Sequence, residues 1–367
     1  MNHRKNYDNI SFSVIDKYQP VRVLGFGTYG DVHEFRTYVN GEAVPVAIKR
    51  IKSVFDNDIH VRRAIRELRI MRHFRGHPNI VQLLDADLVA TPPFQGLYCY
   101  LELMDTDLSS IIRRPSEVIT EWCVANVTYQ LLCALKYIHS SNVVHRDLKP
   151  GNVLVTRQGV VKICDFGLAR GVIGESYDRD KYTNYVTTRW YRAPEIIVCV
   201  DSYHYGLDIW AVGCIFAELV LREPLFRGKS SRDQFILISQ GLGAPPLSWY
   251  ETTASLSTAN RKYDLAAVIM QMPGDKAPTP LRTRFPGMEN ELFYDLLEQL
   301  LVYEPDKRLT ASEALAHPYF TDIANGDETE CEQLLDFDFE KIGRENLKHY
   351  LQKEVQLTRA VVRGFAT

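Results

Sequence analysis

Hydrophobic residues recur at helical spacing in two long stretches of the chain. Between Ile59 and Met71 they occupy one face of a predicted helix, and the same pattern returns between Glu121 and His139. The positions that carry it are 61, 64, 65, 68 and 71 in the first stretch and 124, 127, 131, 135 and 138 in the second. A third stretch, from Ile209 to Leu221, is hydrophobic around most of its circumference but includes Glu218. It is too short to span a bilayer, so we predict a buried core helix.

From Tyr18 to Lys49 the pattern changes to the alternation typical of β-strands, interrupted by glycines. The run Gly25-x-Gly27-x-x-Gly30-x-Val32 lies between two such segments and predicts a hairpin whose backbone can approach phosphate groups closely. By itself this spacing is equally compatible with an ordinary glycine hairpin or with the start of a dinucleotide-binding fold. Further strands are predicted over 97–103 and 160–164.

Lys49 ends the predicted buried strand Val46-Ala47-Ile48-Lys49, where its charge is costly unless negative groups compensate it. A phosphate and a carboxylate would do so. The best candidate for the carboxylate is Glu67, which borders the apolar face of the first predicted helix, one turn after Arg63. The alternative is that Glu67 is a solvated surface residue. Lys49 favours the first interpretation, and with it a phosphate-binding function for the glycine hairpin.

Composition limits the classes of function. The chain has 367 residues, with 43 Lys and Arg against 46 Asp and Glu, and this net charge of −3 predicts no binding to nucleic acid or to anionic membranes. Hydrophobic residues make up 46%, which is ample for a core, and the length fits two or three folding units or one bilobal unit with a tail. The seven cysteines lack C-x-x-C spacing, which argues against disulfides or a zinc site. The polar first residues lack the core of a signal peptide, and we expect no membrane insertion.

The stretch with the clearest chemistry is His145-Arg146-Asp147-Leu148-Lys149-Pro150-Gly151-Asn152, which is followed by Asp165-Phe166-Gly167. Phosphoryl transfer moves dense negative charge between two oxygens, so it depends mainly on positioning and charge compensation. In this pattern Asp147 can accept the proton of an attacking hydroxyl group. Asn152 and Asp165 can supply the ligands of Mg²⁺ ions that bridge the phosphates.

These motifs resemble the catalytic loop and the metal-binding loop of the eukaryotic protein kinases. The resemblance covers residues 18 to about 355. It implies an α+β, bilobal fold, with a small β-sheet N-lobe that carries one regulatory helix and a larger, mainly helical C-lobe. It also implies ATP and Mg²⁺ as cofactors and Lys49–Glu67 as the ion pair of the active arrangement. The residues expected to bind the nucleotide are Leu24, Gly25, Gly27, Gly30, Val32, Ala47, Lys49, the hinge residues Glu102 and Met104, and Asp107.

The resemblance gives four further positions a meaning. Lys149 resembles the lysine that neutralises the transferring phosphate in serine/threonine kinases, and Thr188 resembles the threonine that bonds both this lysine and the base. Asp107 either meets the ribose or caps a helix that starts with Leu-Ser-Ser. Gly151 stands where serine is usual, and we expect only a small effect on the flexibility of the loop.

The sequence Thr183-Asn184-Tyr185, shortly before Trp190-Tyr191-Arg192-Ala193-Pro194-Glu195, resembles the activation loop of the mitogen-activated protein (MAP) kinases. It predicts phosphorylation of Thr183 and Tyr185, each of which would add about two negative charges. Any one nearby arginine could be an ordinary surface charge, but five stand at the family's positions. The expected receivers are Arg63, Arg146 and Arg170 for phosphothreonine, and Arg189 and Arg192 for phosphotyrosine. The asparagine resembles the sporulation-specific MAP kinases of budding yeasts, which implies a role in fungal sporulation or spore wall formation.

The remaining resemblance concerns support and docking. Asp208 is expected to bond the backbone of the catalytic loop, and Glu195 to pair with Arg308. The segment from Thr321 to Glu340 contains acidic residues and no basic one. It is either a solvated tail or the acidic patch that takes basic docking peptides of MAP kinase partners. The docking residues would be Asp327 and Glu328, although Asn325 stands where aspartate is usual.

We therefore predict an N-terminal extension (1–17), an N-lobe (18–103), a C-lobe (104–320) with an insert at about 228–286, and an acidic docking segment with a C-terminal extension that packs on the N-lobe (321–367). The predicted function is ATP-dependent phosphorylation of serine or threonine followed by proline. Expected partners are protein substrates, an upstream activating kinase and basic docking peptides. We expect a monomer in the cytoplasm, the nucleus or both. The alternatives are a pseudokinase scaffold, which would need a missing catalytic residue, and a cyclin-dependent-like kinase, against which the paired Thr183 and Tyr185 argue.

Overall fold

The computed structural model describes residues 4–27, 30–52, 54–172, 188–198, 204–256, 281–326, 328–362 and 364. The chain forms two compact units. The first consists of Met1–Asp105, Cys164–Gly167 and Asp336–Thr367, and the second of Thr106–Ile163 and Leu168–Leu335. The predicted Thr183, Tyr185 and Asp327 sites lie outside the described residues. Among the described helices, none has the length and apolar character needed to cross a membrane.

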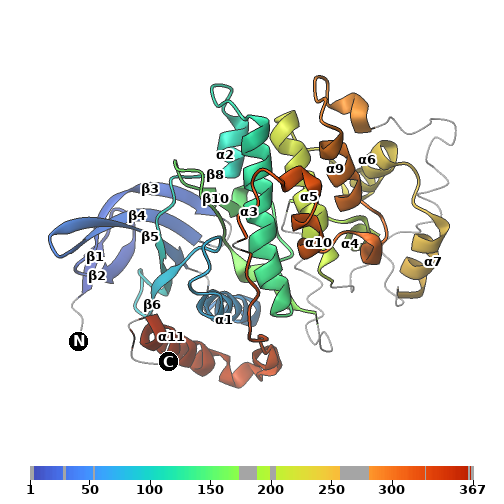
Figure 1. Ribbon diagram of the computed structural model, residues 1–367. Coiled ribbons are helices and arrows are strands. Elements are labelled where there is room, and N and C mark those ends of the chain that lie inside the picture. The colour runs from blue at the N-terminus through green and yellow to red at the C-terminus, as the bar shows by residue number, and fades with distance from the viewer. Residues whose placement is uncertain are drawn as a thin grey trace. The chain divides into compact units, whose positions relative to one another are not determined.

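The first unit is built on a five-stranded antiparallel sheet with the strand order β3-β4-β5-β7-β6 (Figure 1). Its strands are β3 (Gln19–Gly27), β4 (Gly30–Val39), β5 (Glu42–Ile51), β6 (Leu83–Val89) and β7 (Gly96–Glu102). Lys49 on β5 pairs with Val32 on β4 and with Cys99 on β7. The strands predicted over 18–49 and 97–103 are therefore confirmed.

A hairpin formed by β1 (Arg4–Tyr7) and β2 (Phe12–Ile15) adds to this unit before the sheet begins. Phe12 and Val14 are fully buried in one cluster with Phe35, Tyr98 and other sheet residues. The sequence analysis predicts only an N-terminal extension here, with polar first residues. The hairpin forms because the sheet supplies the apolar surface that this short segment lacks.

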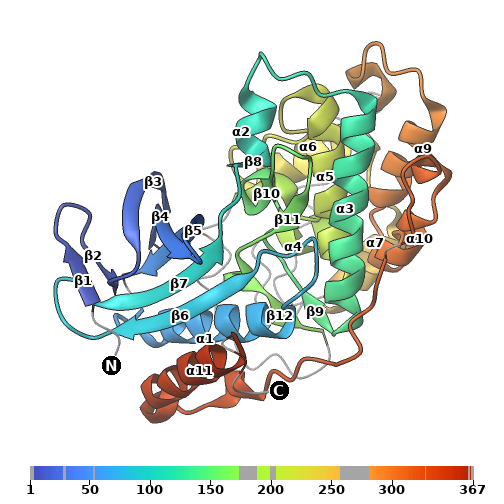
Figure 2. The same ribbon diagram turned by 60° about the vertical axis from the view of Figure 1, so that its left-hand side comes forward.

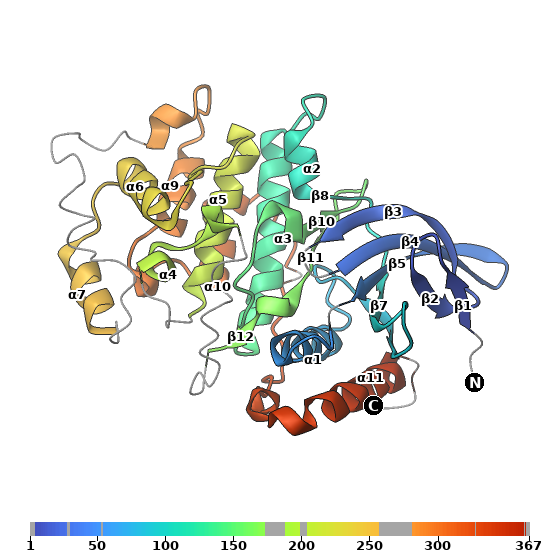
Figure 3. The same cartoon turned by 180° about the vertical axis from the view of Figure 1, so that it is seen from behind.

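Two helices of the first unit, α1 (Asp58–His73) and α11 (Leu347–Val362), lie side by side, and α11 also contacts β6 (Figure 3). Asn57 caps α1 by accepting a hydrogen bond from the His60 N–H at 2.9 Å. The apolar positions predicted to face the core, 61, 64, 65, 68 and 71, are all buried. The predicted helix is therefore confirmed, and its inner face is fixed by hydrophobic burial.

The second unit is mainly helical and has α5 (Gly206–Leu221) in its core, packed against α3 (Glu121–Ser140) (Figure 2). Both predicted helices are thus confirmed. The other helices among the described residues of this unit are α2 (Leu108–Arg113), α4 (Pro194–Val198), α6 (Ser231–Leu242), α7 (Leu247–Leu256), α9 (Glu291–Leu300) and α10 (Ala311–Leu315). Short antiparallel strands flank the catalytic-loop motif: β8 (Thr106–Asp107), β9 (Val143–Val144), β10 (Val153–Val155), β11 (Val161–Ile163) and β12 (Arg170–Gly171). The predicted α+β class, with a sheet unit and a helical unit, is confirmed.

Candidate active site

In the first unit, Lys49 lies between two carboxylates. Its Nζ is 2.5 Å from Glu67 Oε1 and 3.7 Å from Asp165 Oδ1. Glu67 is only 4% exposed, so it is not the solvated surface residue of the alternative interpretation. A buried ammonium group needs such compensation, because an unpaired charge in the interior is costly.

The pKa shifts of this cluster follow from burial and charge. Burial alone would lower the pKa of Lys49, but the charges of Asp165 and Glu67 outweigh it and hold the pKa above its ordinary value. Burial raises the pKa of Glu67 against the opposing charge of Lys49. Lys49 is therefore positively charged at neutral pH. The partly exposed carboxylate of Asp165 lies 3.7 Å from its Nζ.

The glycines of the β3–β4 hairpin have different reasons to be glycine. Gly25 pairs with Val32, and Gly27 pairs with Gly30 at the hairpin end. A Cβ atom on Gly30 would lie 2.1 Å from the carbonyl oxygen of Arg50, so close packing on β5 requires glycine there. A Cβ atom on Gly25 would have no neighbour within 4 Å. Packing explains why residue 30 is glycine. Packing does not explain Gly25, where the close approach of a ligand to the backbone would.

The predicted hinge residues lie at the end of β7. The backbone N–H of Glu102 donates to the carbonyl oxygen of Gln82 at 3.1 Å, and its carboxylate accepts from the Gln82 N–H at 2.7 Å. Ala47 pairs with Leu101, and both Ala47 and Met104 are 8% exposed. These contacts hold the chain after β7 in a defined path before it leaves the first unit.

Asp165 has a left-handed backbone conformation, with φ +66°, which is uncommon for a residue with a side chain. Its Oδ1 accepts a hydrogen bond from the Gly167 N–H at 3.4 Å. Phe166 is fully buried, with its ring centroid 5.9 Å from that of Phe74. Arg66, which directly precedes Glu67, donates to the Gly167 carbonyl oxygen at 2.9 Å. Sequence reasoning did not single out Arg66, although it belongs to a series of arginines along one helix.

In the second unit, the catalytic-loop motif gathers its polar side chains around Asp147. Lys149 Nζ lies 2.7 Å from Asp147 Oδ2. The side-chain nitrogen of Asn152 donates to the Asp147 carbonyl oxygen at 2.8 Å and to Asp147 Oδ2 at 3.0 Å. Because that nitrogen is engaged, the amide oxygen of Asn152 is the side-chain atom that could bind a metal ion. Asn152 and Asp165 both offer oxygen ligands, the type that Mg²⁺ prefers, so their chemistry fits this ion.

Asp208 binds the backbone of the catalytic loop, as predicted. Its two carboxylate oxygens accept the backbone N–H groups of His145 at 2.8 Å and Arg146 at 2.9 Å. Arg146 has φ +69°, so this anchoring keeps an unfavourable backbone conformation directly before Asp147. The predicted pair of Glu195 and Arg308 is also present, with two hydrogen bonds of 2.6 and 2.7 Å. Although burial opposes it, the Arg308 charge lowers the pKa of Glu195 to about 2.

Asp107 is the N-cap of α2: its carboxylate accepts from the Ser110 N–H at 2.9 Å and from the Ser110 hydroxyl at 2.6 Å. The capping interpretation is therefore observed. The structure also places Glu328 against Tyr129, whose hydroxyl donates to its carboxylate. The carboxylate of Glu328, one of the expected docking residues, is thus already hydrogen-bonded within the protein.

The arginines expected to receive phosphate are held in place by backbone carbonyls. Arg146 donates to Leu168 at 3.1 Å, Arg170 to Ala169 at 2.9 Å and Arg189 to Lys229 at 3.2 Å. Burial, followed by the charge of Arg189, lowers the pKa of Arg192, so these two cations lie close enough to repel each other. Arg63 belongs to the first unit, where its charge lowers the pKa of Glu67 against the larger effect of burial.

A small pocket in the second unit lies beside the catalytic loop. Asp147, Thr188, Tyr191, Arg192 and Ile196 are among the residues that line it. Thr188 is exposed, and within the described part of the chain it makes no hydrogen bond with Asp147 or Lys149, which contact each other directly. The expected base, Asp147, and the segment that precedes α4 therefore line the same pocket.

Comparison with known proteins gives a consistent result. The model of the protein kinase domain family matches residues 18–320. The MAP kinase SLT2/MPK1 of Saccharomyces cerevisiae is 40% identical over 97% of this chain and 72% of its own length. The MAP kinase spm1 of Schizosaccharomyces pombe is 41% identical over 97% of this chain and 82% of its own length. The sporulation-specific MAP kinase SMK1 of Saccharomyces cerevisiae is 39% identical over 94% and 89%.

Proposed function

This chain belongs to the protein kinase family and, within it, to the MAP kinases, and from that premise we propose how its own residues perform the serine/threonine kinase reaction. Asp147 is the general base that accepts the proton of the substrate hydroxyl group. Lys149 neutralises the phosphoryl group as it moves. Lys49, held by Glu67, contacts the phosphates of ATP. Asn152 and Asp165 are the Mg²⁺ ligands, and the ion supplies charge compensation on the phosphates when bound.

The observation that carries this proposal is the position of Lys49 between Glu67 and Asp165. The side chain of Lys49 on β5 is only 14% exposed and lies beside one buried and one partly exposed carboxylate, and packing gives no reason for a charge at this position. It has an electrostatic one, because it can pair with a phosphate while Asp165 holds the metal. The hydrogen bonds among Asp147, Lys149 and Asn152 support the assignment of the base and the second metal ligand.

We assign the nucleotide to residues of the glycine hairpin, the sheet and the hinge. Gly25 supports this assignment, because no neighbour in the structure requires the absence of its Cβ. Asp107 caps α2 with its carboxylate, and the proposed ribose contact would use the same group. The proposed nucleotide-binding residues are Leu24, Gly25, Gly27, Gly30, Val32, Ala47, Lys49, Glu102, Met104 and Asp107.

We propose that phosphorylation of Thr183 and Tyr185 by an upstream kinase activates the enzyme. The clustering of cations supports it: Arg192 has a lowered pKa because it is buried beside Arg189, and a phosphate would relieve this repulsion. Arg63, Arg146 and Arg170 are the proposed receivers of the other phosphate. Arg189 lies in the segment expected to meet the residue after the target, which supports serine or threonine followed by proline as substrate.

The proposed partners are protein substrates, the activating kinase and basic docking peptides that bind Asp327 and Glu328. The Tyr129 hydroxyl would have to share Glu328 with such a peptide. A monomer in the cytoplasm or nucleus remains part of the proposal. So does a role in fungal sporulation, which the Thr183-Asn184-Tyr185 sequence supports. The relative named as sporulation-specific is no more similar to this chain than the other two are.

Phosphorylation of a Ser-Pro peptide tests these assignments. Wild type, Asp165→Asn and wild type with phosphates mapped on Thr183 and Tyr185 are compared. We expect activity that disappears in Asp165→Asn and rises with phosphorylation of the loop. A doubly phosphorylated protein that binds ATP but transfers nothing would support the scaffold alternative. Tyr185→Phe should lower activity, whereas a cyclin-dependent-like enzyme would be indifferent to this change.

A further inference from the structure

Arg66 is a buried arginine that connects the C-terminal segment of the chain to the Asp165-Phe166-Gly167 loop. It is 1% exposed and directly precedes Glu67 on α1. One side of its guanidinium group donates to the Gly167 carbonyl oxygen at 2.9 Å. The other side meets Glu340, with Nε and Nη2 each 2.6 Å from Glu340 Oε1. The planar group of arginine suits this double contact, whereas a lysine ammonium would not span it.

Glu340 supplies the negative charge that allows Arg66 to stay buried. A guanidinium group removed from water needs a carboxylate partner, since carbonyl oxygens alone do not compensate its charge. The backbone around Glu340 is fixed as well. Arg62 donates to the carbonyl oxygens of Glu340 at 2.6 Å and Ile342 at 2.7 Å. Glu340 is therefore held in place relative to α1 by contacts that do not involve its own side chain.

The helix that follows Glu340 is anchored along its whole length. Arg69 donates to the Tyr350 hydroxyl at 2.7 Å, and Arg72 pairs with Glu354, which is 1% exposed. The C-terminal segment therefore lies against a row of arginines on α1, the helix that carries Glu67. Because each arginine binds a different group of the segment, α11 cannot slide along α1 without breaking several contacts.

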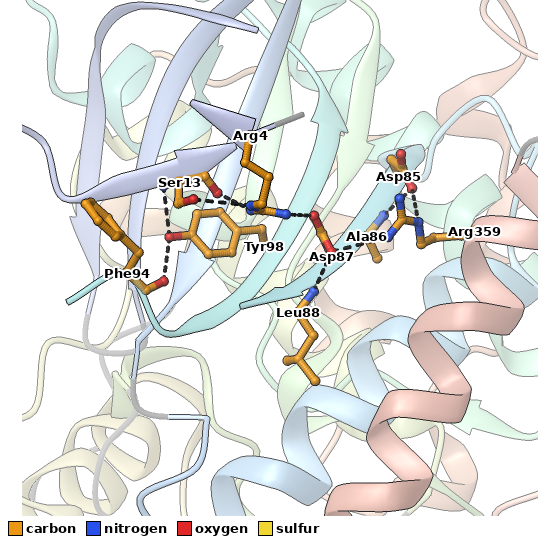
Figure 4. Close-up of polar contacts among 9 residues, drawn as sticks. All are labelled: Arg4, Ser13, Asp85, Ala86, Asp87, Leu88, Phe94, Tyr98 and Arg359. Atoms are coloured by element: carbon orange, nitrogen blue, oxygen red, sulfur yellow. Dashed lines mark hydrogen bonds and ion pairs between the residues drawn. The ribbon is translucent and has the colours of Figure 1, made fainter. Parts of the chain in front are cut away.

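The far end of α11 is anchored on β6 (Figure 4). Arg359 lies 3.7 Å from Asp85 Oδ1 and 3.2 Å from Asp87 Oδ1. Asp87 also pairs with Arg4 of the N-terminal hairpin, so both ends of the chain meet at one carboxylate. This end of α11 is thus fixed independently of Glu340, and loss of the Glu340 side chain would leave α11 in place.

The Gly167 carbonyl is two residues beyond Asp165, and Arg66 holds it from α1. Asp165 is in the left-handed region, and its carboxylate accepts from the Gly167 N–H. A displacement of Gly167 therefore changes the direction of the Asp165 carboxylate. Misplacement of a reacting or metal-binding group by about 1 Å is enough to cost a large factor in function.

We propose that Glu340 is a positioning residue which, through Arg66 and the Gly167 carbonyl, orients Asp165 for binding of the metal–nucleotide complex. This inference rests on the proposed role of Asp165 as a metal ligand. The C-terminal segment thereby takes part in the reaction from outside the kinase domain match, which ends at residue 320. Contacts made by residues that support a metal ligand typically contribute a factor of about 10–100 to metal affinity or activity.

The decisive measurement is the affinity for ADP, determined by calorimetry in Mg²⁺ and again in EDTA. We expect Glu340→Gln to weaken ADP binding in Mg²⁺ by about 10-fold and to leave binding in EDTA unchanged. Glu354→Gln is the matched control, because it breaks another buried carboxylate–arginine pair between α11 and α1 but has no link to Gly167. It should lower the melting temperature at least as much, with ADP affinity unchanged in both media.

Wild type and Asp165→Asn separate the failure of this inference from failure of the proposed function. If Mg²⁺ does not strengthen ADP binding to wild type, or if Asp165→Asn retains the full Mg²⁺ effect, the proposed metal site is wrong. If those two behave as expected but Glu340→Gln binds ADP in Mg²⁺ like wild type, Glu340 is only structural. If Glu340→Gln does not fold, the same ADP-binding measurement is made on Glu340→Asp, which keeps the charge. If neither variant folds, the contact serves folding and the positioning role is rejected.

Discussion

Replacement of Asp208 by asparagine should separate the support of the catalytic loop from its chemistry. Asp208 is 1% exposed and touches no expected substrate group. Its oxygens accept the His145 and Arg146 backbone N–H groups at 2.8 and 2.9 Å, and Oδ2 lies 3.0 Å from His139 Nε2. Asparagine has the same shape, but it keeps one acceptor and turns the other into a donor. One backbone N–H then faces an NH₂ group and loses its partner.

The expected loss follows from these contacts. A hydrogen bond to a charged group contributes about 1.5–3 kcal/mol, and a buried donor without a partner costs about 1–3 kcal/mol. With one of the two backbone bonds lost and the other weakened, we expect Asp208→Asn to lower the free energy of unfolding by about 3 kcal/mol. Arg146, with φ +69°, should relax from its strained conformation, and this would move Asp147.

The effect should also depend on pH. Burial alone would raise the pKa of Asp208, but the contacts with His139 and His145 outweigh it, and its pKa in the folded protein is lowered. A lowered carboxylate pKa gives stability that is present above the unfolded pKa of about 3.9 and is lost as the pH falls through the folded value. The difference between wild type and Asp208→Asn should therefore be constant near neutral pH and narrow below about pH 4.

Urea unfolding at several pH values and a peptide kinase assay provide the measurements. The exposed Asp306→Asn is the control, and it should change the unfolding free energy by less than about 0.5 kcal/mol. Asp208→Asn should reduce kcat by at least about 10-fold through the displacement of Asp147. If Asp208→Asn unfolds like Asp306→Asn and keeps full activity, Asp208 does not hold the loop, and the reasoning fails.

Five other substitutions give distinct expectations. Lys49→Met leaves Glu67 and Asp165 without their shared cation and should reduce kcat by about 10²–10³-fold in the peptide assay; near-normal kcat would contradict the electrostatic role. Gly151→Ser should leave kcat unchanged and should change the unfolding free energy by less than about 0.5 kcal/mol, because a Cβ there has no neighbour within 4 Å. A larger loss of activity or stability would show that the loop needs glycine. Gly30→Ala should lower the melting temperature, whereas Gly25→Ala should leave it unchanged and weaken ATP binding, as calorimetry would show; unchanged ATP affinity would leave Gly25 without a role at the nucleotide. Burial raises the pKa of Glu218, which accepts from the Tyr191 hydroxyl at 2.6 Å, to about 7. The folded state then binds more protons than the unfolded state between about pH 4.5 and 7, so stability should fall as the pH rises across this range, and Glu218→Gln should remove that slope in urea unfolding.

Much of the fold was predictable because its signals are local. The buried face of α1 follows from apolar spacing within the helix, and all five predicted positions are buried. The strand predicted up to Lys49, which is β5 and continues to Ile51, and the buried helix α5 follow from local composition in the same way. The catalytic-loop contacts of Asp147, Lys149 and Asn152 join residues two to five positions apart, so their spacing already implied them. The family match rests on the same local motifs.

The sequence by itself thus determined most of the elements, the family and the chemistry of the reacting groups, since each depends on residues that are neighbours along the chain. Tertiary structure alone decided which distant groups meet. Arg66 and Glu340 are separated by 274 positions, and no local period indicates that they pair. The N-terminal hairpin forms because its apolar side chains pack on the sheet. Glu328 accepts a hydrogen bond from the Tyr129 hydroxyl because two segments that are distant in the sequence lie side by side. Burial selects such partners, because an unpaired charge in the interior costs far more than one on the surface.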